Sequence, residues 1–177
     1  TYHMDIHGFA KDSVFSCEKA GENELVFAME DTRETLEQYP SYYTPITAQE
    51  GALIVNTEMM KENNLPMPKS IKDLANPEYK GFISVTDIEG SSTAWLMIQA
   101  LISSYGEDQT KEILKKIYEN AGPHLEDSGS GPLKKVRAGE VAIGFGLRHQ
   151  AIADKNNGLP IDYVDPTEGN YVLTESL

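Results

Sequence analysis

The 177-residue chain has a single cysteine, Cys17, and few basic residues. One cysteine cannot form an internal disulfide, and no Cys and His ligands at zinc-site spacing accompany it, so we expect Cys17 to be a small buried apolar residue. Fifteen Lys and Arg against 28 Asp and Glu give a formal net charge of −13. Such a surface repels a phosphate backbone, so nucleic acid is excluded as an expected partner.

Long apolar runs are also missing. The longest, residues 94–102, is interrupted by Gln99 and falls far short of the roughly 20 residues that cross a bilayer. Residues 1–5 lack the basic start and apolar run of a secretory signal. We therefore expect no membrane span, and a chain that is either cytosolic or a mature or excised piece of an exported protein.

From Gly51 onward, short β-branched apolar runs alternate with helical patterns, whereas the first fifty residues have only a weak pattern. This alternation predicts an α/β fold with a mixed, mostly parallel sheet flanked by helices and joined by right-handed crossovers. Thr57 is expected to cap the first helix, and a serine-then-acid spacing at Ser70 and Asp73 predicts a capping box. Strands are predicted over 52–55, 82–85, 124–126, 141–145 and 161–164. Helices are predicted over 57–63, 91–102, 107–120 and 147–156, and a further helix follows residues 127–132 and ends at 138–139.

Two predicted strand-to-helix junctions are rich in hydroxyl groups and glycine. In an open α/β sheet, ligands collect at the carboxyl ends of strands, where helix N-termini present free N–H groups. We predict that the junctions form a two-sided cradle for an oxyanion, which would use neutral donors and helix dipoles. The alternative is that the hydroxyls only cap helices and the glycines only form turns. The candidate residues are Ser91, Ser92 and Thr93 at the first junction and Ser128, Ser130 and Gly131 at the second.

Arg148 and His149 follow a third predicted strand. Arg148 could hold a phosphonate or carboxylate through two hydrogen bonds, or it could form an ordinary surface ion pair. We expect His149 to be structural or exposed. The chain has no P-loop lysine and no complete dinucleotide-binding glycine spacing.

Other candidate sites are weaker. His3, Asp5 and His7 are three possible metal ligands without a partner cluster. Adjacent tyrosines such as Tyr42 and Tyr43 can bind ferric iron, but more often one ring packs in a core. No catalytic triad spacing or nucleophile elbow occurs, so we expect neither an enzyme nor a cofactor.

Several motifs occur in an order that resembles a known family. Residues 68–74 and 77–81 match the pattern P-x-S-x-x-D-L followed by P-x-[WY]-K-G, and residues 139–144 match the G-E-x-x-[IL]-G part of the pattern A-x-G-E-x-x-[IL]-G. Over about residues 36–171, the chain resembles the central part of bacterial extracellular solute-binding proteins of ABC importers. The resemblance is to the branch with the type II periplasmic-binding fold that binds ferric iron or 2-aminoethylphosphonate.

This resemblance implies a two-lobed receptor, acting as a monomer outside the cytoplasm, that closes on a small solute and delivers it to a membrane permease. Residues 1–50 would belong to the first lobe or the approach to the hinge, 51–165 to the second α/β lobe, and 166–177 to the return towards the hinge. The matched portion corresponds to about the middle half of a family member.

The resemblance also implies a small anionic solute, a phosphonate or a phosphate-bearing molecule, held by the two hydroxyl-rich junctions and by Arg148. Related phosphonate receptors have a Glu-Tyr-Arg segment where this chain has Arg148, His149 and Gln150, which leaves the solute open. The alternatives are a ferric-iron receptor, or a transferase on the same scaffold that would use acids such as Asp87, Glu89 and Asp127.

Overall fold

The structure is a computed structural model that describes residues 15–19, 25–29 and 45–176, with side chains from 49 to 172. It divides into two compact units, one of residues 1–48 with 174–177 and one of residues 49–173. In the first unit, β1 (Phe15–Lys19) and β2 (Leu25–Met29) form an antiparallel pair. Cys17 lies in β1, and its burial stays a prediction because its side chain is outside the described part.

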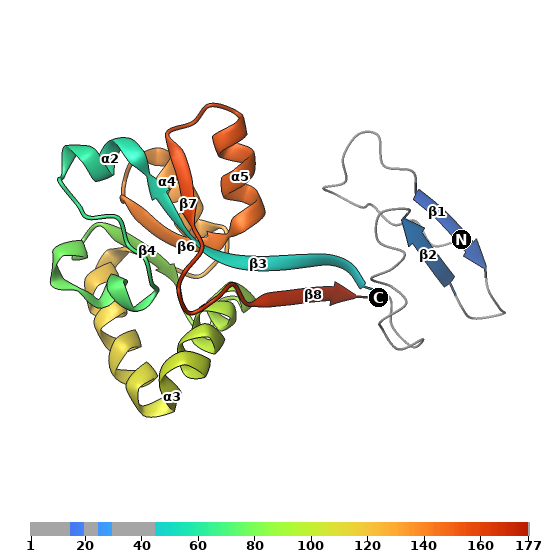
Figure 1. Cartoon of the computed structure of the whole chain (residues 1–177), viewed down its shortest axis with the longest axis horizontal. Coiled ribbons are helices and arrows are strands. Elements are labelled where there is room, and N and C mark those ends of the chain that lie inside the picture. The colour runs from blue at the N-terminus through green and yellow to red at the C-terminus, as the bar shows by residue number, and fades with distance from the viewer. Residues whose placement is uncertain (1–14, 20–24, 30–44, 177) are drawn as a thin grey trace. The chain divides into compact units, whose positions relative to one another are not determined.

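The second unit is built around a sheet with the strand order β5-β4-β6-β3-β7, and β8 pairs with β3 beside this path. Strand β4 is parallel to β5 and β6, whereas β3 is antiparallel to β6 and β7. Along this path, only β3 therefore opposes the others, and the predicted mixed, mostly parallel sheet is confirmed (Figure 1). The bounds are β3 Pro45–Asn56, β4 Ile83–Thr86, β5 Leu125–Glu126, β6 Ile143–Leu147, β7 Ile161–Val164 and β8 Val172–Ser176.

Side chains of β3 point alternately into two cores, as the pleat of a strand requires. Leu53 and Val55 join the core beneath α3, while Ile54 joins the core beneath α4 and α5. The helices thus cover both faces of the sheet (Figure 1). Their bounds are α2 Thr57–Glu62, α3 Ser92–Ala121, α4 Gly131–Ala138 and α5 Arg148–Asn156, with short 3-10 helices at Lys72–Ala75, Pro77–Tyr79 and Gly122–His124.

Helix α3 replaces the two helices predicted over 91–102 and 107–120. The two segments run into each other at Gly106, whose φ of 77° and ψ of 168° are not helical. Glycine adopts this conformation without the steric cost of a Cβ atom. The predicted break is therefore a kink, with no separate connecting loop.

Two strand boundaries differ from the prediction. Strand β6 begins at Ile143 and not at residue 141, because the N–H groups of Ala142 and Ile143 both donate to the carbonyl of Phe82. Val141 and Ala142 are buried and apolar, so they have a strand-like composition without belonging to the ladder. Strand β3 begins at Pro45, well before the predicted residue 52. The prediction missed the first half of the strand because that half is largely polar and contains no apolar run.

Local hydrogen bonds explain where the short helices begin. Asn56, and not the predicted Thr57, caps α2, because its Oδ1 accepts from the N–H groups of Glu58 and Met59 at 3.1 Å each. The predicted capping box is confirmed: Ser70 N–H donates to Asp73 at 3.0 Å, and Asp73 N–H donates to Ser70 Oγ at 3.1 Å. It opens a single turn of 3-10 helix.

Tyr79 links this turn to the main core. Its ring is buried, and its hydroxyl donates to the Pro66 carbonyl at 2.9 Å. Burial, and secondarily the charge of Glu78, raises the pKa of the Tyr79 phenol from 10.0 to about 12. Between those pH values the unfolded chain ionises first, so this group makes stability fall as pH rises.

We predict that Tyr79→Phe lowers the free energy of unfolding by about 1 kcal/mol at pH 7, through the lost hydrogen bond. The variant should also lose less stability than the parent between pH 10 and pH 12. Urea unfolding across this range measures both effects. Parallel pH curves for parent and variant would contradict the assigned pKa.

Candidate functional site

The two predicted junctions lie side by side. Strands β4 and β5 are parallel neighbours, so their carboxyl ends meet at one edge of the sheet, where α3 and α4 begin. The loop after β4 is tied to β5 by a hydrogen bond from Asp87 N–H to the Glu126 carbonyl at 2.8 Å. The topology therefore brings together the turns that carry Ser91 to Thr93 and Ser128 to Gly131.

Glycine allows the two turns to touch. A Cβ atom at Gly129 would lie 2.7 Å from Ser91 Oγ and closer still to Thr93 Oγ1, which is tighter than real contacts allow. A Cβ atom at Gly90 would likewise run into the backbone of Asp127, 3.0 Å from its Cα. Each turn thus has a glycine at the point where the other comes closest. The hydroxyl groups of Ser91 and Thr93 therefore lie against the backbone of the turn that precedes α4.

The other predicted residues of this region have different roles and exposures. Ser91 Oγ accepts from Thr93 N–H at 3.2 Å, so Ser91 caps α3. This agrees with the alternative prediction that the hydroxyls of the junctions cap helices. Ser128 Oγ lies 3.3 Å from Ser130 Oγ, and Ser130 precedes α4 without capping it through its side chain. Ser92 is exposed and Gly131 is buried. A ligand role for any of these residues stays a prediction.

Thr86 is a residue of this edge that the sequence prediction missed. It is the last residue of β4, only 2% exposed, and its Oγ1 makes no hydrogen bond within the described part of the chain. A buried hydroxyl without a partner is energetically costly. The available signal was a threonine that directly continues the apolar run 82–85.

Carboxylates near the turns are engaged locally. Asp87 accepts from Glu89 N–H at 2.9 Å, which shapes the turn before α3. Glu126 pairs with Lys135 at 3.2 Å, and hydrogen bonding to Glu126 is the main cause that raises the pKa of Lys135. Asp127 is exposed. Among the described residues, no group of three or more His, Cys, Asp or Glu side chains could hold a metal ion.

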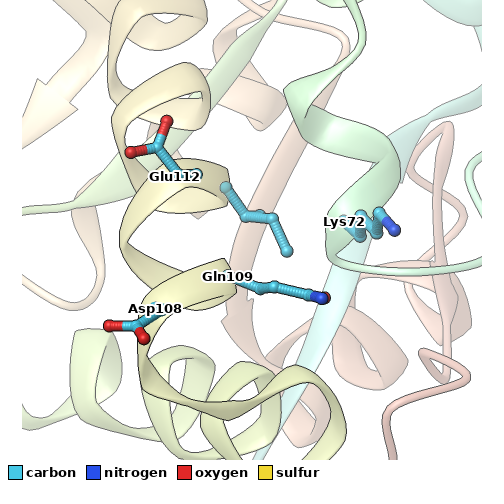
Figure 2. Close-up of a pocket in the computed structure, with 5 residues that line it drawn as sticks. Lys72, Asp108, Gln109 and Glu112 are labelled. Carbon is cyan, nitrogen blue, oxygen red and sulfur yellow. The ribbon is translucent and has the colours of Figure 1, made fainter.

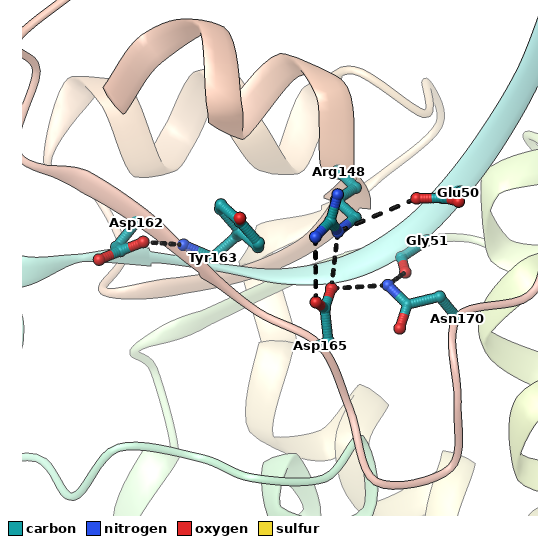
Figure 3. A network of polar contacts seen from close by, with 7 residues as sticks. All are labelled: Glu50, Gly51, Arg148, Asp162, Tyr163, Asp165 and Asn170. Atoms are coloured by element: carbon teal, nitrogen blue, oxygen red, sulfur yellow. Dashed lines mark hydrogen bonds and ion pairs between the residues drawn. The ribbon is translucent and has the colours of Figure 1, made fainter. Parts of the chain in front are cut away.

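Arg148, which follows the third predicted strand, already forms ion pairs with side chains of this chain (Figure 3). Its Nε and Nη2 donate to the two carboxylate oxygens of Asp165 at 2.8 and 3.2 Å, and its guanidinium stacks 4.7 Å from the centre of the Tyr163 ring. Glu50 lies 3.9 Å from Nε. These contacts lie on the β3 and β7 side of the sheet, whereas the serine turns follow β4 and β5. The structure thus pairs Arg148 apart from the two turns, and its ligand role stays a prediction.

This network ties together the ends of two strands. Asn170 Nδ2 donates to Asp165 Oδ1 at 2.7 Å and to the Gly51 carbonyl at 3.1 Å, and Gly51 N–H donates to the Tyr171 carbonyl at 3.2 Å (Figure 3). Hydrogen bonding from Arg148 is the largest cause that lowers the pKa of Asp165. The network therefore joins β3, the loop after β7 and the segment that leads into β8.

The remaining candidates are His149 and five residues near the N-terminus. His149 is exposed, as expected. His3, Asp5, His7, Tyr42 and Tyr43 lie outside the described residues, so their possible metal-binding roles stay predictions.

A separate open pocket of about 400 Å³ lies along the second half of α3 (Figure 2). Asp108, Gln109 and Glu112 project from α3 on one side, and Lys72 stands on the other. Ile113 completes the lining. None of the predicted site residues lines this pocket, and the Lys72 ammonium packs 4.9 Å from the centre of the Tyr105 ring. The pocket is thus distinct from the cradle.

Comparison with known proteins decides the family. The family model described as bacterial extracellular solute-binding protein matches residues 9–177. The chain belongs to this family. The resemblance drawn from its motifs is thereby confirmed.

Two curated proteins are similar to part of this chain. The chain is 32% identical over 116 residues to an uncharacterised protein of Haemophilus influenzae, covering 65% of this chain and 33% of the relative. It is also 32% identical over 119 residues to the spermidine/putrescine-binding periplasmic protein of Escherichia coli, covering 62% and 33%. The chain spans about a third of the length of these curated relatives.

Solved structures confirm the predicted type II periplasmic-binding fold. The periplasmic binding protein AfuA from Actinobacillus pleuropneumoniae, with exogenous fructose-6-phosphate bound, is 27% identical with a TM-score of 0.70, over 76% of this chain and 42% of that chain. The periplasmic binding protein P5PA is 25% identical with a TM-score of 0.69, over 83% and 46%. Iron-bound HitA from Pseudomonas aeruginosa, at 20% identity and a TM-score of 0.57 over 76% and 44%, shares the fold.

In the part of the chain that the structure describes, no helix combines the length and hydropathy needed to span a bilayer.

The contact between the turns can be tested with Gly129→Ala. Gly129 lies outside the left-handed region, so its backbone tolerates alanine, and the added Cβ must push against Thr93 and Ser91. We predict a loss of about 1–3 kcal/mol in the free energy of unfolding, as for other overpacked sites. Adding Thr93→Ala should recover part of the loss, because it removes the closest atom. Strictly additive effects in urea unfolding would show that the turns do not touch.

The Arg148 network predicts a pH dependence. The pKa of Asp165 is lowered in the folded state, so its ionised form stabilises the protein above about pH 4, and this contribution is lost as pH falls. We expect Asp165→Asn to be less stable than the parent at pH 7, with the difference shrinking towards pH 3. Asp108→Asn, which removes an exposed carboxylate 4.0 Å from Lys111, is the matched control. A difference independent of pH would refute the role of the Asp165 charge.

Proposed function

We propose that this chain is part of the solute-binding component of an ABC importer and captures a small anionic solute, a phosphonate or a phosphate-bearing molecule. The observation that carries the proposal is the contact of two helix-start turns at Gly129, which places the hydroxyls of Ser91 and Thr93 against the backbone of the second turn. Membership of the solute-binding family supports the transport role.

The chemistry of this region suits an oxyanion. Hydroxyl groups and the N–H groups of helix starts are donors, and the dipoles of α3 and α4 favour negative charge at this edge. Such short-range interactions outweigh the net charge of −13, because physiological salt screens exposed charges over about 8 Å. Ser91, Ser92, Thr93, Ser128, Ser130 and Gly131 would hold the anion, with Arg148 as a further partner if it leaves Asp165.

The wider role follows from the family. The full receptor would have two lobes and close on its solute, with the 51–165 segment as the second lobe. It would act as a monomer outside the cytoplasm and present the solute to a membrane permease. The structure of AfuA with fructose-6-phosphate supports a phosphate-bearing solute. No catalytic step is proposed.

A polyamine is the second candidate. The 32% identical relative from Escherichia coli binds spermidine and putrescine, and carboxylates suited to ammonium groups border the turns at Asp87, Glu89 and Asp127. The ferric-iron alternative has less support, because the iron-bound relatives share only the fold and Tyr42 and Tyr43 lie outside the described residues.

A ligand screen on the full-length protein tests the proposal. Fructose-6-phosphate, 2-aminoethylphosphonate, inorganic phosphate, putrescine and ferric citrate would each be added in a thermal-shift assay. A solute at 100 times its Kd adds about 2.7 kcal/mol of stability, so we expect a clear rise in Tm with a phosphate or phosphonate.

Calorimetry on variants then assigns the site. Ser91→Ala combined with Ser128→Ala should lower the affinity for the anion by about ten-fold or more, because hydrogen bonds to charged groups are strong. Ser103→Ala, an exposed serine on α3 outside the turns, is the control and should bind normally. A rise in Tm with putrescine or ferric citrate alone would overturn the anion assignment.

A further inference from the structure

Two large apolar side chains border the candidate anion site without being buried. Trp95, in the first turn of α3, and Ile88, in the loop before it, are each 54% exposed. The other large apolar residues exposed in the described part, Met67, Leu159 and Val172, occur singly on separate segments. The edge that carries the serine turns is therefore also where exposed apolar surface is concentrated.

Helix geometry directs Trp95 towards the serine turn. Trp95 follows Ser92 by three residues, so the two share one face of α3, and both are exposed, whereas Thr93 and Leu96 face the interior. Long side chains in a helix lean towards its N-terminus and cover the preceding turn. We therefore expect the indole to lean over the flank of the helix start where an anion would meet the free N–H groups.

The hydroxyl-rich turns alone cannot select among phosphates. Inorganic phosphate and a phosphate ester present similar oxyanions to Ser92 and the N–H groups at the start of α3, so any preference has to arise from the rest of the solute. The exposed indole of Trp95 presents a large apolar face to solvent. Aromatic faces pack well against rings and the C–H surface of sugars. Ile88, in the loop that leads into α3, is equally exposed and offers a second apolar side chain.

We propose that Trp95, together with Ile88, forms a wall against which the organic part of a phosphate ester packs, and so selects esters over inorganic phosphate. This inference rests on the proposed function and deepens it by naming the solute class: an anionic head joined to a sugar-like or ring-like body. Trp95 acts as a specificity-determining residue beside the donors that hold the phosphate.

The experiment compares fructose-6-phosphate with inorganic phosphate on the full-length protein. By calorimetry, Trp95→Ala should lose about ten-fold or more in affinity for the sugar phosphate and less than about two-fold for inorganic phosphate. Trp95→Phe should keep most of the preference because it retains an aromatic face. Met67→Ala, which removes a side chain of similar exposure outside this edge, should leave both affinities unchanged.

Tryptophan fluorescence gives a second measurement, because Trp95 is the single tryptophan of this chain. The parent minus Trp95→Phe difference spectrum should show a solvent-exposed indole that shifts to the blue when fructose-6-phosphate is added. A blue emission without ligand that does not respond to it would mean that another protein surface covers the indole, and would overturn the proposal.

The outcomes distinguish failure of the Trp95 wall from failure of the anion site. If Trp95→Ala binds fructose-6-phosphate as well as the parent does, or loses equally for both phosphates, the wall is refuted while the anion site stands. If the parent binds neither phosphate, the proposed function fails, and this inference fails with it. Circular dichroism of each variant identifies any that does not fold, in which case Trp95→Phe and the fluorescence shift decide.

Discussion

The close approach of two strand-to-helix turns is the constraint on which the candidate site depends. Strands β4 and β5 pair in parallel, so the chain reaches the same edge of the sheet twice and starts a helix each time. The turns touch only because Gly90 and Gly129 have no side chains at the points of contact. Any Cβ atom there would separate the hydroxyls of α3 from the backbone that faces them.

An acidic protein can hold an anion when the donors at the site are neutral and some of the nearby charged groups already have partners. Glu126 is paired with Lys135, and Asp87 accepts a backbone hydrogen bond within its own turn. The guanidinium of Arg148 is likewise occupied, by Asp165 and by the face of Tyr163. Arg148 in this state links Glu50 of β3 with Tyr163 of β7 and with Asp165. The arginine predicted to hold a ligand therefore has a structural role in the network of Figure 3.

Most of the elements could be predicted from the sequence because apolar runs and helix signals have a short range. The capping box of Ser70 and Asp73 and the break at Gly106 are local features, and both were found. The differences have both local and non-local causes. The first half of β3 has no apolar run to mark it. Strand β6 begins at Ile143 because the N–H groups of Ala142 and Ile143 both donate to the carbonyl of Phe82, which lies far earlier in the chain.

The sequence by itself determined that the chain alternates strands and helices, that its motifs belong to solute-binding proteins, and that serines and glycines gather at two helix starts. Only the tertiary structure decided that these helix starts meet, that Thr86 is buried without a partner, that Trp95 is left in water, and that Arg148 turns towards Asp165. The physical reason is that residue type and spacing govern local conformation. Strand order and the crossovers between strands govern which distant groups come within contact distance.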